Sequence, residues 1–221
     1  MSYRIIYHGS NLIVDKPVYR HPLMKAHNDY GYGFYCTQSL DMAKEWANRI
    51  SVGGYANKYL FDDRGLDILD LTDKSKYSVL NWIAILLHNR EISIVDRVEY
   101  AEELEFIEQY YIDISKYDVV IGFRADDAYF KFPLMFIRNV LSIERLEEIY
   151  NLGQLGKQFV LISERSFERI KFTEAIPSEA IYKERYLSRL DAADNAYKEL
   201  ELQERKNKGT RIRDLIEAKN D

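Results

Sequence analysis

The sequence is poor in cysteine, proline and long apolar runs, and each shortage excludes a class of protein. A single cysteine in 221 residues, Cys36, cannot form an internal disulfide, which fits a reducing compartment. Only 4 prolines and 10 glycines exclude collagen-like and low-complexity chains. The longest apolar run, Val79–Leu87, is interrupted by Asn81 and is far shorter than the ~20 residues of a membrane span. Because no basic and apolar leader follows Met1, we expect a cytoplasmic protein without a membrane partner.

The charge balance does not indicate a nucleic-acid partner. The chain has 31 Lys and Arg residues against 36 Asp and Glu, a net charge of −5, and no dense basic stretch. Aromatic residues, by contrast, are abundant. The 18 tyrosines and 10 phenylalanines are enough for a sizeable core, and tyrosine also supplies flat, hydrogen-bonding walls for a pocket.

The order of the elements predicts an α+β fold. Strands are expected at Tyr3–Tyr7, Asn57–Asp62, Leu66–Leu71, Asp118–Phe123 and Gln158–Ser163, with a short one at Ile170–Thr173. Helices are expected from an N-cap at Ser39 to Gly53, with Ala43, Trp46, Ala47 and Ile50 on one face, and over Ser78–His88, Glu99–Tyr111 and Ser142–Leu152. Because short strands and helices alternate irregularly, a regular doubly wound sheet is not expected.

The charge density changes after Pro177, the last proline. Residues 178–221 contain 20 charged side chains in 44 positions, against 47 in the 177 positions before them. We therefore divide the chain into a domain over residues 1–177 and a charged helical tail over 178–221.

The tail has one narrow apolar stripe. Its members are spaced 4-3-4-3 along a predicted long helix, and they are Tyr186, Leu190, Ala193, Tyr197 and Leu200. An apolar stripe on a terminal helix has to be covered. Two alternatives stay open: the stripe docks on the protein's own body, or it binds a partner, either an antitoxin-like protein or a second copy of the chain.

Three motifs carry the residues that could bind a ligand. His8 ends the first strand and is followed by Gly9 and Ser10, so it can be a ligand-binding histidine or an ordinary turn residue. The segment Gly31–Thr37 places aromatic rings beside two glycines, which suits a stacking wall or a core strand. Gln158 opens the predicted strand Gln158–Ser163, where a polar residue can face a pocket or simply end the strand.

Taken together, these motifs resemble the ADP-ribosyltransferase superfamily of the histidine–tyrosine–glutamate type, and within it the bacterial domain of unknown function 3990 family. The resemblance covers about residues 3–174 and leaves the tail outside. It rests on Tyr7–Ser10, Gly31–Thr37, Ile121–Gly122 with Ala125–Asp127, and Gln158–Val160. It implies a split β core with surrounding helices, and transfer of ADP-ribose from NAD to a macromolecule, above all a protein.

The resemblance also implies roles for individual residues. His8 would hold a ribose hydroxyl of NAD, backbone groups of Gly9 would bind the carboxamide, and Tyr35 would stack on the nicotinamide ring. The remaining implied NAD-binding residues are Ser10, Gly33, Phe34 and Thr37. NAD is the only cofactor implied, as a co-substrate, and no metal is implied.

Gln158 departs from the family pattern, because it stands where the catalytic glutamate is expected. A neutral amide can hold a ribose hydroxyl but supplies no negative charge as nicotinamide leaves. Asp126 or Asp127 would supply that charge from a neighbouring turn, unless both simply cap the following helix. If the amide only positions ribose, Gln158→Glu is expected to raise nicotinamide release by ~10-fold or more.

Three functions compete at this point. The first is a mono-ADP-ribosyltransferase, a toxin-like or phage-related effector. The second is a non-catalytic NAD- or nucleotide-binding or protein-interaction module, which Gln158 favours. The third is a metal hydrolase or phosphodiesterase built on Asp62, Asp63, Asp126 and Asp127, which is less favoured because no histidine lies at ligand spacing beside them.

Overall fold

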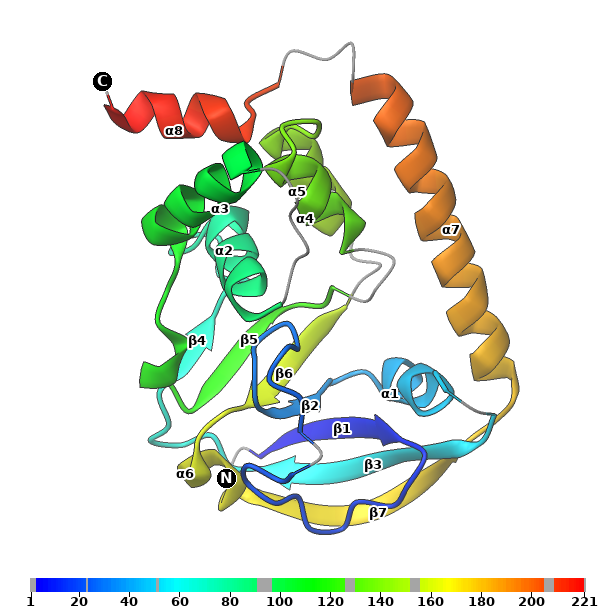
Figure 1. The fold of residues 1–221 in the computed structure, drawn as a ribbon. Helices are drawn as coiled ribbons and strands as arrows, with labels where there is room; N and C mark the ends of the chain where they lie inside the picture. The colour runs from blue at the N-terminus through cyan, green and yellow to red at the C-terminus, as the bar shows by residue number, and fades with distance from the viewer. Residues whose placement is uncertain are drawn as a thin grey trace.

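The computed structural model describes residues 3–22, 24–50, 52–90, 97–125, 130–151, 156–204 and 209–220. The chain folds into two β-sheets and a set of helices, so the predicted α+β class is confirmed (Figure 1). The strands are β1 (Arg4–Ser10), β2 (Phe34–Cys36), β3 (Gly54–Phe61), β4 (Ile68–Asp70), β5 (Val119–Phe123), β6 (Lys157–Leu161) and β7 (Ile170–Ser178). The helices are α1 (Leu40–Ala47), α2 (Val79–Asn89), α3 (Arg97–Tyr110), α4 (Lys131–Ile137), α5 (Ile143–Asn151), α6 (Glu164–Phe167), α7 (Ile181–Glu204) and α8 (Ile212–Asn220), with a 3-10 turn at Ile114–Lys116.

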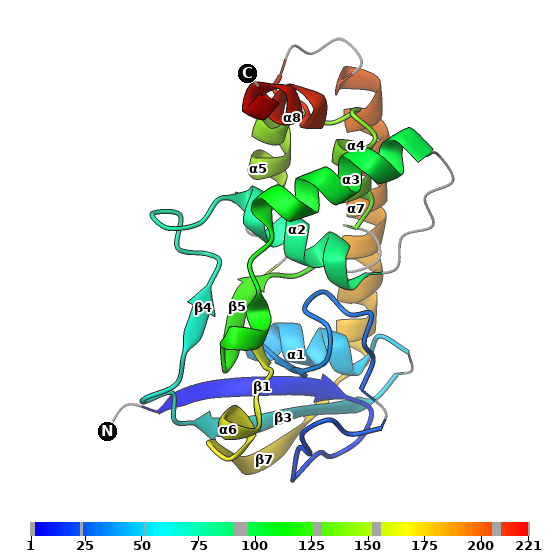
Figure 2. The same ribbon diagram turned by 60° about the vertical axis from the view of Figure 1, so that its left-hand side comes forward.

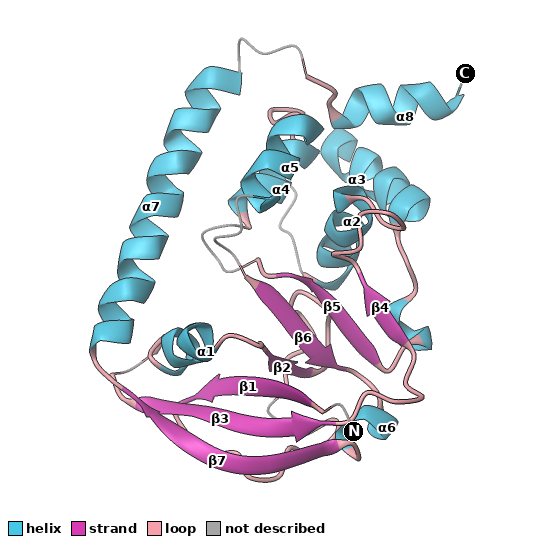
Figure 3. Ribbon diagram, turned by 180° about the vertical axis from the view of Figure 1, so that it is seen from behind, coloured by secondary structure: helices cyan, strands magenta, loops and turns pink. Residues whose placement is uncertain are grey.

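The strands divide between two sheets, as a split β core requires. One sheet has the order β1-β3-β7 and is antiparallel throughout. The other has the order β2-β6-β5-β4, in which only β4 and β5 run parallel (Figure 3). A single bridge joins β1 to the segment after β2: Tyr7 and Thr37 exchange backbone hydrogen bonds of 2.7 and 2.9 Å. This bridge brings the end of β1 next to β2.

The sheets face each other across an aromatic core. Ile6 of β1 and Tyr59 and Phe61 of β3 pack with Phe34 of β2 and Phe159 of β6, and all five are at most 6% exposed. The second sheet is covered on its other face by a helical layer in which α2 supplies the fully buried Trp82 (Figure 2). Apolar cover on both faces explains why β5 is an almost unbroken apolar run.

Helix α1 is shorter than its sequence pattern predicts. Ser39 caps it as expected, accepting a hydrogen bond of 3.2 Å from the backbone N–H of Met42. The helix ends at Ala47, however, because the fully buried Asn48 turns the chain, its Oδ1 accepting from the N–H of Gly53 at 2.8 Å. Ile50 was predicted on the apolar face of this helix, and this prediction is wrong, because Ile50 lies beyond the helix and is 86% exposed.

Strand β7 is longer than the predicted Ile170–Thr173. It pairs with β3 as far as Ser178, so Pro177 lies inside the strand, opposite Tyr55. An end strand tolerates a proline that directs its missing N–H away from its neighbour. The continuation beyond Thr173 was missed because the exposed face of the strand is polar and a proline normally argues against a strand.

Helix α7 places the tail stripe against the rest of the chain (Figure 1). Ala193 is 1% exposed in the main apolar core, and Leu190, Tyr197 and Leu200 pack against that core. Tyr186 is 7% exposed. The stripe is therefore covered within the chain, and a partner using these side chains would have to displace α7. Among the described residues, no helix combines the length and apolar sequence needed to cross a bilayer.

Candidate functional site

Residues from distant parts of the chain meet at one cavity of about 810 Å³. Of the residues proposed from the sequence, those that line it are His8, Gly9, Ser10, Gly33, Phe34, Tyr35 and Gln158. Thr37 is not among the lining residues; it forms the bridge to Tyr7, and its Oγ1 accepts from the N–H of Ser39 at 3.2 Å. Asp126 and Asp127 lie outside the described residues. The cavity volume is within the ~300–1,000 Å³ of small-molecule sites.

His8 is held in one orientation by β2. Its Nδ1 lies 2.8 Å from the carbonyl oxygen of Tyr35, and its ring stacks on Phe34 with centroids 4.4 Å apart. A carbonyl oxygen only accepts, so Nδ1 carries the proton and donates. Burial lowers the pKa of His8, which keeps the ring neutral. In this tautomer Nε2 is a hydrogen-bond acceptor.

Tyr35 has an anchored end and an open end. Its hydroxyl donates to the carbonyl oxygen of Gly31 at 2.7 Å and accepts from the N–H of Tyr30 at 3.0 Å. The hydroxyl thus fixes the preceding loop, while the half-buried ring lines the cavity. Burial raises the pKa of this phenol well above its usual range, so it stays protonated.

The glycines beside these residues also serve packing, a role that the sequence did not reveal. A Cβ on Gly33 would lie 2.6 Å from Cγ1 of Val160 on β6, so Gly33 lets two strands approach. A Cβ on Gly9 would lie 2.0 Å from the carbonyl oxygen of Ala43, so Gly9 lets α1 pack on β1. Their backbones still line the cavity.

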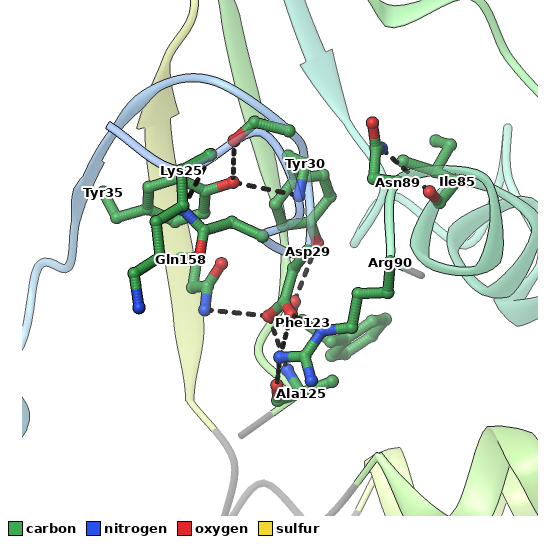
Figure 4. A network of polar contacts seen from close by, with 12 residues as sticks. Lys25, Asp29, Tyr30, Tyr35, Ile85, Asn89, Arg90, Phe123, Ala125 and Gln158 are labelled. Atoms are coloured by element: carbon green, nitrogen blue, oxygen red, sulfur yellow. Dashed lines mark hydrogen bonds and ion pairs between the residues drawn. The ribbon is translucent and has the colours of Figure 1, made fainter. Parts of the chain in front are cut away.

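Gln158 is part of a buried polar network that includes a carboxylate (Figure 4). Its Nε2 donates to Oδ2 of Asp29 at 3.1 Å, and the N–H of Ala125 donates to the same oxygen at 2.9 Å. The other oxygen, Oδ1, accepts from Nε and Nη2 of Arg90 at 2.9 and 2.6 Å. Gln158 is 6% exposed and Asp29 3% exposed. Burial raises the pKa of Asp29, and the charge of Arg90 opposes that rise.

The oxygen of the Gln158 amide has no hydrogen-bond partner in the structure, although it is buried. A buried acceptor without a partner costs about 1–3 kcal/mol. A side chain that lines a cavity can recover that cost when a ligand donates to it. Two hydrogen-bond acceptors, Oε1 of Gln158 and Nε2 of His8, thus belong to residues that line the cavity.

Three residues of this site were missed in the sequence. Asp29 lies just before the glycine segment that was singled out, and Arg90 follows a buried helix, where a cation usually interacts with the helix end. The fully buried Asn57 binds the cavity wall: its Oδ1 accepts from the N–H of Val14 at 3.0 Å and its Nδ2 donates to the carbonyls of His8 and Leu12. Of these three residues, only Asp29 could have been found from the sequence, because it lies next to the segment Gly31–Thr37.

The cavity lining is positively charged, although the whole chain is acidic. Among the described residues that line it, the cations are Lys16, Lys25, Arg49, Arg90 and Arg124, and the anions are Asp15 and Asp29. This excess favours an anionic ligand. Within the described part of the chain, no three His, Cys, Asp or Glu side chains are grouped to hold a metal ion.

Fold and site together define an α+β protein with a cavity lined by residues of both sheets and by more cationic than anionic described side chains. Residues 4–172 match the family described as protein of unknown function (DUF3990), and the chain belongs to this family. The match ends before α7 and α8. Comparisons with curated proteins and with solved structures found no match.

Proposed function

We propose that this protein is an NAD-dependent mono-ADP-ribosyltransferase that modifies a protein acceptor. The observation that carries the proposal is the convergence of His8, Tyr35 and Gln158, from three strands, on one cavity. The sequence resemblance assigned NAD contacts to His8 and Tyr35 and placed Gln158 at the catalytic position. A shared cavity is the arrangement those assignments require.

The residues of the cavity fit the parts of NAD. Nε2 of His8 and Oε1 of Gln158 are acceptors, which suits the donor hydroxyls of a ribose. The ring of Tyr35 suits a planar nicotinamide, and the cationic lining suits a diphosphate. No part of this fit needs a metal.

The chemistry follows from the bond that has to break. When bound, NAD supplies an ADP-ribosyl group whose bond to nicotinamide breaks as positive charge develops on the ribose, much as in glycoside hydrolysis. Gln158 and His8 would hold the ribose while that charge develops, and the cavity walls would exclude water. The acceptor's own side chain would be the nucleophile, so the protein itself needs none.

A protein acceptor is favoured by apolar side chains on the open side of the cavity. Leu12, Ile13, Val18 and Ile50 all line it and are all more than half exposed. Exposed apolar groups gathered in one place are typical of a surface that contacts another protein. Such a surface beside the ribose would bring an acceptor to the reacting bond.

A second function, NAD or nucleotide binding without turnover, is favoured by the neutral amide of Gln158. The neighbouring carboxylate, Asp29, is already paired with Arg90. A site of this kind would bind NAD through the same residues and release no nicotinamide.

Incubation with labelled NAD separates the two functions. We expect wild-type protein to release nicotinamide and to transfer label to a protein in a bacterial lysate or to itself. His8→Ala should lower release by ~10-fold or more, because it removes one ribose contact. His88→Ala is the matched control, since His88 lies on α2 and does not line the cavity. Saturable NAD binding without release would support the second function, and absence of both binding and release would refute the first function and NAD as the ligand in the second.

A further inference from the structure

Asp29 gathers four hydrogen bonds on two oxygens, which leaves no room for a carboxyl proton. Its donors are Nε and Nη2 of Arg90, the N–H of Ala125 and Nε2 of Gln158. All four are N–H groups, and an ionised carboxylate is the form that only accepts. Arg90 compensates the charge of this buried carboxylate at a distance of 2.6 Å.

This carboxylate decides which way the Gln158 amide points. An amide has a donor end and an acceptor end, and only the donor end can face Asp29. With Nε2 held at 3.1 Å from Oδ2, Oε1 is the end left over; it is buried and has no hydrogen-bond partner, and Gln158 is one of the residues that line the cavity. A hydrogen bond to an anion also polarises the amide and makes its oxygen a stronger acceptor.

We infer that Asp29 is a positioning residue that fixes the Gln158 amide with Oε1 toward the ligand and places a negative charge directly behind it. The inference rests on the proposed function for its catalytic meaning. The two side chains together provide what one glutamate would provide: an acceptor oxygen and a nearby anion. Among the described residues, Asp29 is the one that would supply the negative charge for which the sequence suggested Asp126 or Asp127.

The inference reverses the expected effect of Gln158→Glu. Without Asp29, a new carboxylate would add a useful charge. Beside Asp29 it would be a second buried carboxylate, and like charges at this distance force the pair to share a proton. At low pH the shared proton substitutes for the amide N–H, and the remaining carboxyl oxygen takes the place of Oε1.

The test is a set of variants assayed for nicotinamide release against pH: Asp29→Asn, Gln158→Glu, the double variant, and Asp67→Asn as an exposed control. Asp29→Asn should lower release at saturating NAD by ~10-fold or more, since the amide is free to turn. Gln158→Glu should be most active at low pH and lose activity as pH rises. The double variant restores an amide–carboxylate pair, so it should recover most of the lost activity and lose that pH dependence.

Three outcomes would overturn the inference: unchanged release in Asp29→Asn, a wild-type pH profile in Gln158→Glu, or a folded double variant no better than Asp29→Asn. If the wild-type chain neither binds nor cleaves NAD, the proposed function fails instead. A second measurement tests the Asp29 contact even if the wild type does not act on NAD or the variants do not fold. In nuclear magnetic resonance spectra of the ¹⁵N-labelled wild type, one side-chain amide proton of Gln158 should be shifted downfield and protected from exchange, whereas two freely exchanging protons would overturn the Asp29 contact.

Discussion

His8 and Tyr35 are joined by a hydrogen bond of 2.8 Å between Nδ1 and the Tyr35 carbonyl oxygen, although 27 positions separate them in the chain. The bond depends on the bridge between Tyr7 and Thr37, which holds the end of β1 against β2. The ring of His8 is therefore oriented before any ligand arrives. Preorganisation of this kind lowers the entropic cost of binding.

The first prediction concerns the protonation of His8. Burial lowers its pKa, and the neutral ring is the form with a free acceptor at Nε2. NAD affinity should therefore be constant from pH 8 to about pH 6.5, the ordinary histidine value, and should fall below it. The free energy of unfolding should also decrease below this pH, because His8 in the unfolded chain has the higher pKa and takes up its proton first as pH falls. Calorimetric titrations at several pH values test this, and tighter binding at pH 5.5 than at pH 7.5 would contradict it.

The second prediction separates the two ends of Tyr35. Tyr35→Phe keeps the ring but leaves the buried N–H of Tyr30 without its acceptor, so it should cost about 1–3 kcal/mol of folding free energy and preserve NAD affinity. Tyr35→Ala should in addition weaken NAD binding by about 1–3 kcal/mol, the value of a stacking platform. Denaturant unfolding and calorimetry measure the two effects. Tyr32→Ala is the matched control, because Tyr32 is 56% exposed and does not line the cavity. Unchanged NAD affinity in Tyr35→Ala would make Tyr35 a packing residue only.

The third prediction tests why position 9 is a glycine. A methyl group there would meet the carbonyl oxygen of Ala43 at 2.0 Å, so Gly9→Ala must push α1 away from β1. We expect a loss of about 1–3 kcal/mol in the free energy of unfolding. If Gly9 served ligand approach alone, the variant would keep its stability and lose only NAD affinity.

The fourth prediction uses two adjacent alanines on α7. Ala193 is 1% exposed, whereas Ala192 is on the exposed side of the helix. Ala193→Arg should destabilise the protein by at least ~2 kcal/mol, because it buries an unpaired charge. Ala192→Arg should be neutral. Thermal unfolding and sedimentation together decide between the alternatives for the tail stripe. If Ala193→Arg kept the wild-type unfolding midpoint but lost a dimer that the wild type forms, the stripe would be assigned to a partner.

The sequence predicts the fold class and the positions of most elements, because apolar periodicity and capping residues act locally. Ser39 caps α1, and the apolar run around Val120 forms a central strand. The end of α1 and the length of β7 were predicted wrongly. Both depend on contacts across the chain, namely the hydrogen bond of Asn48 to Ser178 and the pairing of β7 with β3, which no local pattern reveals.

For the candidate site, too, residues with a local sequence signal were predicted and residues that depend on distant contacts were missed. His8, Tyr35 and Gln158 were identified because each lies in a short recognisable motif. Asp29 and Arg90 were not, because their importance comes from meeting Gln158, 129 positions from Asp29 in the chain. Gly9 and Gly33 were also identified, but their packing role was missed, since only the three-dimensional structure shows what their missing side chains leave room for.

The most direct test of the central claim is a calorimetric titration of NAD into wild-type protein, His8→Ala and Gln158→Ala. The claim that NAD binds between these residues predicts saturable binding by the wild type and affinities at least ~10-fold weaker in both variants. The His88→Ala variant should bind as the wild type does. No NAD binding by the wild type, or equal binding by all four proteins, would contradict the account.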